Sequence, residues 1–95
     1  MNGNALGLIE TFGLVGLIHA VDAMLKAASV AVASSVIKLD GGVVSVLIQG
    51  DVSSVRAAVE AGAEAAARIG DLRAAHVIPR PDPSVVRAFS GGAAR

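Results

Sequence analysis

The chain contains no cysteine, tryptophan or tyrosine, and Phe12 and Phe89 are its only large aromatic side chains. Without cysteine, neither a disulfide nor a thiolate metal site can stabilise the fold. Two phenylalanine rings are too few to provide a platform on which nucleic-acid bases could stack. A single domain of 95 residues with these absences depends on aliphatic packing, either within the chain or against other chains.

An excess of charge is also absent. Eight basic residues balance eight acidic ones without clustering, which argues against nucleic acid as a partner. Although 54% of the residues are hydrophobic, no uncharged apolar run approaches the roughly 18 residues of a membrane span. Residues 1–11 lack a basic start and include Glu10, so we expect no signal peptide and no membrane partner.

Alanine accounts for 19 of the residues. Because alanine buries little area, a small alanine-rich domain gains limited stability from its own core. We therefore expect the missing burial to come from neighbouring copies, and oligomerisation is the default prediction.

The segment between residues 30 and 50 is the most distinctive part of the chain. Two β-branched runs, residues 30–38 and 43–49, predict two strands, and Asp40-Gly41-Gly42 predicts a tight turn between them. Lys38 and Asp40 are the only charged residues in the segment. We therefore expect a charged hairpin tip that projects from the sheet.

Hydrophobic periodicity predicts five further elements: strands at residues 5–12 and 72–78, and helices at residues 14–28, 52–69 and 84–89. Asp51 is suited to N-cap the second helix, and Gly70 to end it. Pro79 and Pro81 must end the last strand, because proline cannot donate to a ladder.

Each of the two longer helices has an apolar stripe that is expected to lie on the sheet. The first stripe consists of Leu14, Leu17, Ile18, Val21, Leu25 and Ala28. The second consists of Val52, Val55, Val59, Gly62, Ala66 and Ile69. The opposite face of the second helix has an i, i+4 charge ladder: Arg56, Glu60, Glu64 and Arg68.

The order β-α-β-β-α-β with a short C-terminal helix predicts an α+β, ferredoxin-like fold. Such a fold has one antiparallel sheet with two helices on one face. One domain is expected over residues 4–89, followed by a flexible tail at residues 90–95. The fold supports many functions, so function must be argued from particular residues.

The sequence predicts no catalytic, cofactor or metal site. His19 and His76 have no partner at ligand spacing, and Ser34 and Ser35 have no adjacent base. Residues 13–16 open a helix with two glycines, but their spacing does not match a phosphate-binding loop.

The Asp22–Lys26 pair and Arg80 have two interpretations each. Asp22 and Lys26, at i and i+4, form either an ordinary surface ion pair or part of an interface. Arg80 is either solvated or, because prolines on both sides fix its backbone, a rigidly presented cation suited to an interface.

Five segments together resemble a known family: residues 5–11 (ALGLIET), 23–28 (AMLKAA), 50–52 (GDV), 61–63 (AGA) and 76–81 (HVIPRP). In this order they are similar to the single-domain, hexamer-forming shell proteins of bacterial microcompartments, and the likeness covers about residues 4–86. In that family six copies form a flat disc, discs tile into a shell, and the hairpin turn lines a pore on the sixfold axis.

The resemblance implies two groups of site residues. The pore-lining residues would be Lys38, Leu39, Asp40, Gly41 and Gly42. The residues at the edge between hexamers would be Asp22, Lys26, Ser29 and Arg80. The chain departs from the family pattern at Asp40, where a glycine is common, and at Ser29, where an asparagine is frequent. The first departure puts the family's usual pore chemistry, suited to polar or anionic metabolites, in question. Lys38 could offset the new charge by pairing with Asp40.

The resemblance implies a structural protein, not an enzyme, without a cofactor: a homohexamer that tiles into a shell in the bacterial cytoplasm and passes small metabolites. Its partners would be its own copies, neighbouring hexamers and other shell proteins, with encapsulated enzymes as further candidates. Two alternatives remain at this point: a regulatory module that senses a small anion between subunits, and a small enzyme. The missing anion pocket counts against the first, and the missing nucleophile–base or metal pair against the second.

Overall fold

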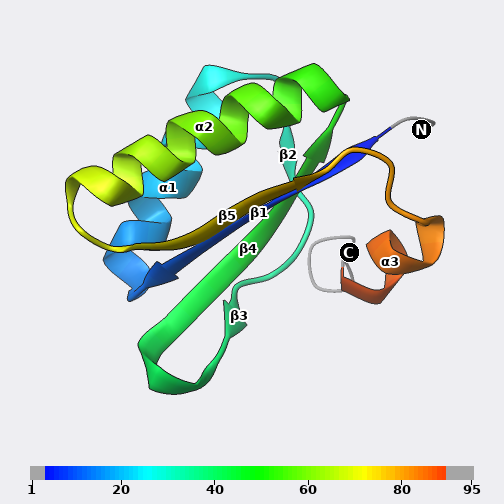
Figure 1. The fold of residues 1–95 in the computed structure, drawn as a ribbon. Helices are drawn as coiled ribbons and strands as arrows, with labels where there is room; N and C mark the ends of the chain where they lie inside the picture. Colours follow the sequence, from blue (N-terminus) through cyan, green and yellow to red (C-terminus); the bar gives the residue numbers. More distant parts are fainter. Residues whose placement is uncertain (1–3, 90–95) are drawn as a thin grey trace.

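A computed structural model of the chain describes residues 4–89, so the tail expected at residues 90–95 lies outside the described residues. The elements are β1 (Ala5–Phe12), α1 (Leu14–Ala27), β2 (Ala31–Val32), β3 (Ile37–Lys38), a 3₁₀ turn (Asp40–Gly42), β4 (Val43–Gly50), α2 (Val52–Arg68), β5 (Leu72–Ile78) and α3 (Pro83–Phe89). Helices α1 and α2 lie side by side along one face of the sheet (Figure 1). The predicted α+β class is confirmed.

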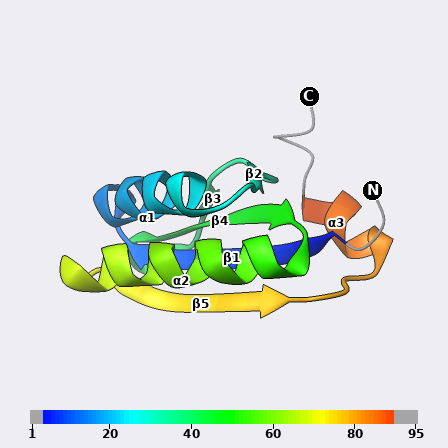
Figure 2. The ribbon, with the colours of Figure 1, turned by 90° about the horizontal axis from the view of Figure 1, so that it is seen from above.

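The sheet is antiparallel, with the strand order β2-β4-β1-β5, and β3 pairs with β4 as well. The central strand β1 pairs with β4 from Ala5 opposite Gly50 to Phe12 opposite Val43. On its other side β1 pairs with β5, where Leu6 lies opposite Ile78 (Figure 2). This order is that of the predicted ferredoxin-like fold. It places the turn before β4 and the C-terminal end of β5 at opposite ends of the sheet.

The prediction of one continuous strand at residues 30–38 is wrong. Strands β2 and β3 have two residues each, and they pair with β4 in different registers. Between them the buried Ser34 accepts a hydrogen bond at its Oγ from the backbone N–H of Leu47, at 2.9 Å. A short polar side chain thus takes the place of a backbone acceptor and interrupts the ladder.

The predicted core face of α1 is also largely wrong. Of its six residues only Leu17 is buried, whereas Leu14, Ile18 and Leu25 are exposed. The buried face consists of Gly16, Leu17, Ala20 and Met24. This face meets α2 at Gly62, where an added Cβ would lie 2.6 Å from the Met24 Cγ and 3.2 Å from the Ala20 carbonyl oxygen. Small residues at this contact allow the two helices to pack closely, while Leu14, Ile18 and Leu25 of α1 stay outside the core.

The prediction for α2 is confirmed in most respects. Val55, Ala58, Val59, Gly62 and Ala66 form its buried face, while Ile69 is exposed. Asp51 caps the helix, because its Oδ1 accepts a hydrogen bond at 2.9 Å from the backbone N–H of Ser54. That bond and those from the Ser53 and Ser54 hydroxyls hold the pKa of Asp51 below its usual value. Gly70 ends the helix in the left-handed region, with φ of 76°.

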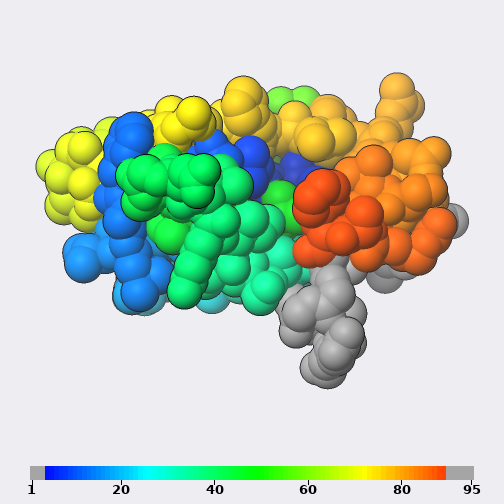
Figure 3. All heavy atoms as spheres, turned by 90° about the horizontal axis from the view of Figure 1, so that it is seen from below, coloured from blue at the N-terminus to red at the C-terminus, as the bar shows by residue number. Residues whose placement is uncertain are grey.

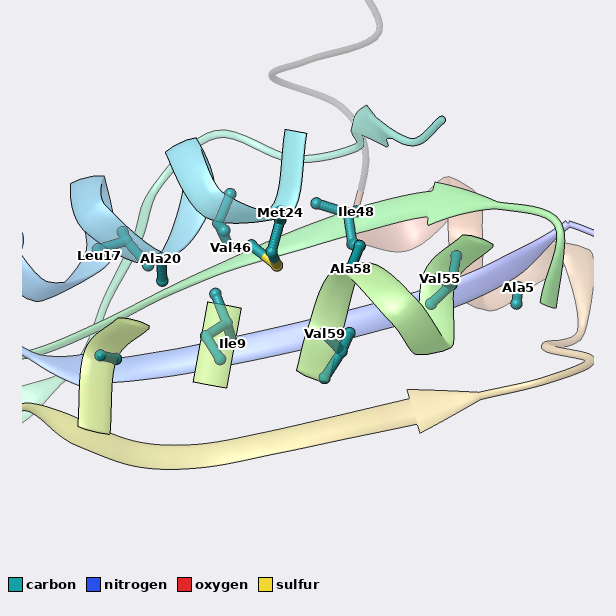
Figure 4. Packing of buried hydrophobic residues seen from close by; sticks show 11 residues of the cluster. Ala5, Ile9, Leu17, Ala20, Met24, Val46, Ile48, Val55, Ala58 and Val59 are labelled. Carbon is teal, nitrogen blue, oxygen red and sulfur yellow. The ribbon is translucent and has the colours of Figure 1, made fainter. Parts of the chain in front are cut away.

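The core is a single layer of aliphatic side chains between the two helices and the sheet (Figure 4). Its largest side chains are Ile9 of β1, Leu17 and Met24 of α1, Ile48 of β4 and Val55 of α2. Gly7 is part of this packing, since a Cβ added there would meet Val59 Cγ2 at 2.6 Å. Within residues 4–89 no helix combines the length and the apolar character that a membrane crossing requires.

Candidate pore turn and assembly edges

The turn at residues 39–42 projects from the end of β3 and β4 (Figure 1). Leu39, Asp40, Gly41 and Gly42 are all exposed, and the two glycines have φ angles of 79° and 81°. Residues with a side chain rarely adopt this left-handed backbone conformation, so the two glycines are what permit the tight turn. The projecting charged tip expected from the sequence is present.

Backbone hydrogen bonds fix the turn. The N–H of Leu39 donates to the Val43 carbonyl oxygen at 2.8 Å, and the N–H of Gly13 donates to the Gly42 carbonyl oxygen at 2.9 Å. The second bond ties the turn to the residue that precedes α1. The tip is therefore held against the body of the domain.

Lys38 and Asp40 do not pair. The ion pairs of the described part of the chain join Lys26 to Asp22 and Arg73 to Glu10. Lys38 lies in β3 opposite Val44, while Asp40 begins the 3₁₀ turn. The Lys38–Asp40 ion pair that the sequence left open is therefore not formed in the structure of one subunit.

The residues expected at the hexamer edge lie at the other end of the domain. Lys26 is in the last turn of α1 and forms an ion pair of 2.9 Å with Asp22, both side chains being well exposed. Ser29, just beyond that helix, is exposed. Arg80 follows β5 and is exposed beside Pro79. Figure 1 shows α1 and β5 both ending at the end of the molecule that is remote from the turn at residues 39–42.

An exposed apolar surface runs along α1 and was not predicted from the sequence. Val15 and Ile18 are 65% and 60% exposed. With the side chains of β2 and the segment after it, α1 forms a shallow groove lined by Leu14, Ile18, Val21, Leu25, Val32 and Val36. We call these six residues the α1 groove. The sequence signal for this surface was the apolar stripe of the first helix, but that stripe was predicted to face the core.

The sheet face away from α1 and α2 carries a second apolar groove, beside α3. Its lining includes Leu6, Leu8, Leu47, Ile78, Val85 and Phe89. Figure 3 views the molecule from this side, with a hollow between α3 and the turn region and β1 visible at its floor. Asp82 precedes α3 and accepts a hydrogen bond from the Ser84 N–H at 2.8 Å, which lowers the pKa of Asp82.

Glu10 is the acidic side chain of this second groove, and this side chain is 14% exposed. Arg73 of β5 donates to Glu10 Oε1 at 2.8 Å. A charge so nearly buried needs a partner, and Arg73 supplies it. Because the two residues are 63 positions apart in the sequence, the pair could not be read from spacing.

The histidines and acidic residues do not gather into a metal site. Within residues 4–89 no group of three His, Asp or Glu side chains is arranged to hold a metal ion. His19 on α1 and His76 on β5 are both exposed and belong to different elements. The notable surface features of residues 4–89 are therefore the charged turn at residues 39–42 and the two apolar grooves.

The chain is an antiparallel α+β domain with two helices on one face, a hairpin tip at one end and exposed apolar surfaces. The chain matches the family model of the BMC domain over residues 5–81. It is 45% identical over 92 residues to the bacterial microcompartment shell protein PduA of Citrobacter freundii, covering 97% of this chain and 98% of that protein. The chain therefore belongs to the BMC domain family.

Two further curated relatives and one solved structure are also similar to this chain. The bacterial microcompartment shell protein EutM of Escherichia coli is 50% identical over 88 residues, which are 93% of this chain and 90% of that protein. The carboxysome shell protein CsoS1 of Prochlorococcus marinus is 50% identical over 91 residues, which are 95% of this chain and 87% of that protein. A microcompartment protein of Desulfitobacterium hafniense superposes with a TM-score of 0.83 and 34% identity. That superposition covers 95% of this chain but 48% of the solved one, so this chain spans about half its length.

Proposed function

We propose that this chain is a structural shell protein of a bacterial microcompartment. It forms cyclic homohexamers over residues 4–89 that tile edge to edge, and the turn at residues 38–42 lines a central pore for small metabolites. Family membership and the names of three relatives support the shell role. The ring, the pore and the edge residues are proposals for this chain.

One observation carries the proposal: the turn and the expected edge residues lie at opposite ends of the domain. The register puts Val43, which follows the turn, beside Phe12, whereas Ile78, near Arg80, lies beside Leu6. A subunit that points its turn at a central axis therefore directs Lys26 and Arg80 outward. This radial arrangement is the one that both a pore and an edge contact require.

The apolar surface of α1 supports association through unlike faces. The α1 groove lies at the β2 side of the sheet, whereas β5 forms the other side. A ring with cyclic symmetry joins two different surfaces of each subunit, so each copy can cover its neighbour's groove. The exposed side chains Ile18 and Val15 gain the burial that the isolated domain does not give them.

We further propose that the chain acts without catalysis and resides in a shell in the bacterial cytoplasm. Its partners are its own copies, neighbouring hexamers and other shell proteins, and encapsulated enzymes are candidates for contact with the disc face. The relatives named as shell proteins support the structural role.

Native mass spectrometry with negative-stain electron microscopy of the purified protein tests this function. We expect particles with the mass of six chains, which at higher concentration form flat hexagonal sheets. Stable dimers or trimers without sheets would contradict the proposal and would favour the regulatory-module alternative.

A further inference from the structure

We propose that the turn at residues 39–42 makes the pore cation-selective, so that it admits cationic and neutral polar solutes such as amines more readily than carboxylates or phosphates. The inference rests on the proposed hexamer with this turn at its axis. It concerns a feature specific to this chain, which is the carboxylate of Asp40.

The turn presents little side-chain chemistry besides this carboxylate. Gly41 and Gly42 have no side chains, and their positive φ angles would strain the backbone of any residue with a side chain. Leu39 adds an apolar side chain, half exposed. Asp40 is exposed and is the charged residue among residues 39–42, and the exposed Lys38 directly precedes them.

No cation in the described part of the same subunit is paired with Asp40. Lys38 is the nearest cation in the sequence, yet it lies in β3 without an ion pair to Asp40. Lys26 and Arg73 already have acidic partners elsewhere. Within residues 4–89 the Asp40 carboxylate is thus left without an ion pair.

The turn is also held in one conformation. The Leu39–Val43 and Gly13–Gly42 backbone hydrogen bonds, of 2.8 and 2.9 Å, fix it at both ends. A fixed turn repeats the carboxylate at the same height in each of six subunits. Such a ring of carboxylates attracts cations and repels anions, which is how carboxylate rings select cations in channels.

The test is the reversal potential of wild-type hexamers in a planar bilayer under a KCl gradient. The comparison is with Asp40→Asn, which keeps the shape of the side chain and removes its charge. Glu64→Gln is the matched control, because it removes an exposed carboxylate from α2. Mass spectrometry of each variant first establishes that it is hexameric.

We expect the wild type and Glu64→Gln to prefer K⁺ over Cl⁻, and Asp40→Asn to lower the permeability ratio by about threefold or more at low salt. The difference should shrink at high salt, because the Debye length falls from about 30 Å at 0.01 M to about 3 Å at 1 M. Lys38→Met should preserve or raise the preference for K⁺.

Two results would overturn the inference while leaving the pore in place: a wild type that prefers Cl⁻, or an unchanged ratio in Asp40→Asn. Verified hexamers without any conductance would instead contradict the pore itself, and with it that part of the proposed function. The two failures are therefore distinguishable in one experiment.

Discussion

The backbone N–H of Gly13 donates a 2.9 Å hydrogen bond to the carbonyl oxygen of Gly42. This bond joins the start of α1 to the hairpin turn, although the two residues are far apart in the sequence. It connects the element that bears the exposed apolar groove to the element that we propose as the pore lining. Changes at the turn should therefore affect both stability and conductance.

Gly42→Ala should destabilise the protein by about 1 kcal/mol, because alanine at a left-handed φ is strained. Gly42 has φ of 81°. Thermal and chemical denaturation measure the loss. Gly70→Ala is the matched control, since Gly70 has φ of 76° and also has open space around it. Both should lose similar stability, but only Gly42→Ala should alter pore conductance. Equal conductance in wild type and Gly42→Ala would speak against a pore at this turn.

Lys26→Ala and Arg80→Ala should leave intact hexamers that no longer form extended sheets. The Lys26–Asp22 pair is exposed, so losing it should cost the fold only a few tenths of a kcal/mol. At an edge contact, by contrast, the long side chain contributes packing and hydrogen bonds on all edges of the disc. Negative-stain microscopy measures sheet extent, with Arg56→Ala on the exposed face of α2 as the control. Sheets of normal size from either edge variant would refute the edge assignment.

Ile18→Ser should weaken the hexamer and leave the subunit folded. Ile18 is 60% exposed in the isolated domain, so its removal opens no core cavity. If a neighbour covers it, each interface loses about 1.5–3 kcal/mol of apolar burial. Circular dichroism reports folding, and the mass distribution on dilution reports assembly. Leu17→Ala, at a buried position of the same helix, should instead destabilise the fold by about 2–5 kcal/mol. An Ile18→Ser hexamer as resistant to dilution as the wild type would place this surface outside the interface.

Asp51→Ala should lower stability at neutral pH, and the difference from wild type should fade in acid. The hydrogen bonds from Ser54 and Ser53 hold the pKa of Asp51 in the folded state below its ordinary value of 3.8. The contribution of the ionised cap is therefore complete above 3.8 and is lost as the pH falls through the lower, folded-state value. Denaturation at fixed protein concentration measures it. Asp51→Asn keeps a capping acceptor without this titration, so its stability should lack the acid-dependent loss due to residue 51. A wild-type-to-Ala difference that stays constant from neutral to acidic pH would contradict this account of the cap.

The parts of the fold that could be predicted were those with strong local signals. Asp51 and Gly70 were correctly placed at the two ends of α2, and Gly41 and Gly42 in the turn, because each answers a backbone requirement within a few residues. Continuous pairing through Ser34 could not be judged this way. The outcome there depends on a hydrogen bond with Leu47, thirteen residues away.

The apolar face of α1 shows a second limit of sequence reasoning. Leu14, Ile18 and Leu25 have the spacing of a core stripe, yet Ala20 and Gly16 take the core side. Periodicity records that a face is apolar and does not say whether the chain or a neighbour covers it. For the candidate site, the charged turn could be predicted from its own few residues. Its place at the opposite end of the domain from Lys26 and Arg80 follows only from the order and pairing of the strands.

The symmetry of the assembled particle tests the central claim most directly. A single-particle electron microscopy reconstruction of the wild-type protein measures how many subunits form the ring and which segment borders its axis. We predict a sixfold ring with a central opening bordered by residues 38–42, and with Lys26 and Arg80 at its outer rim. A particle of another symmetry, or a ring with the turn at its rim, would contradict the account.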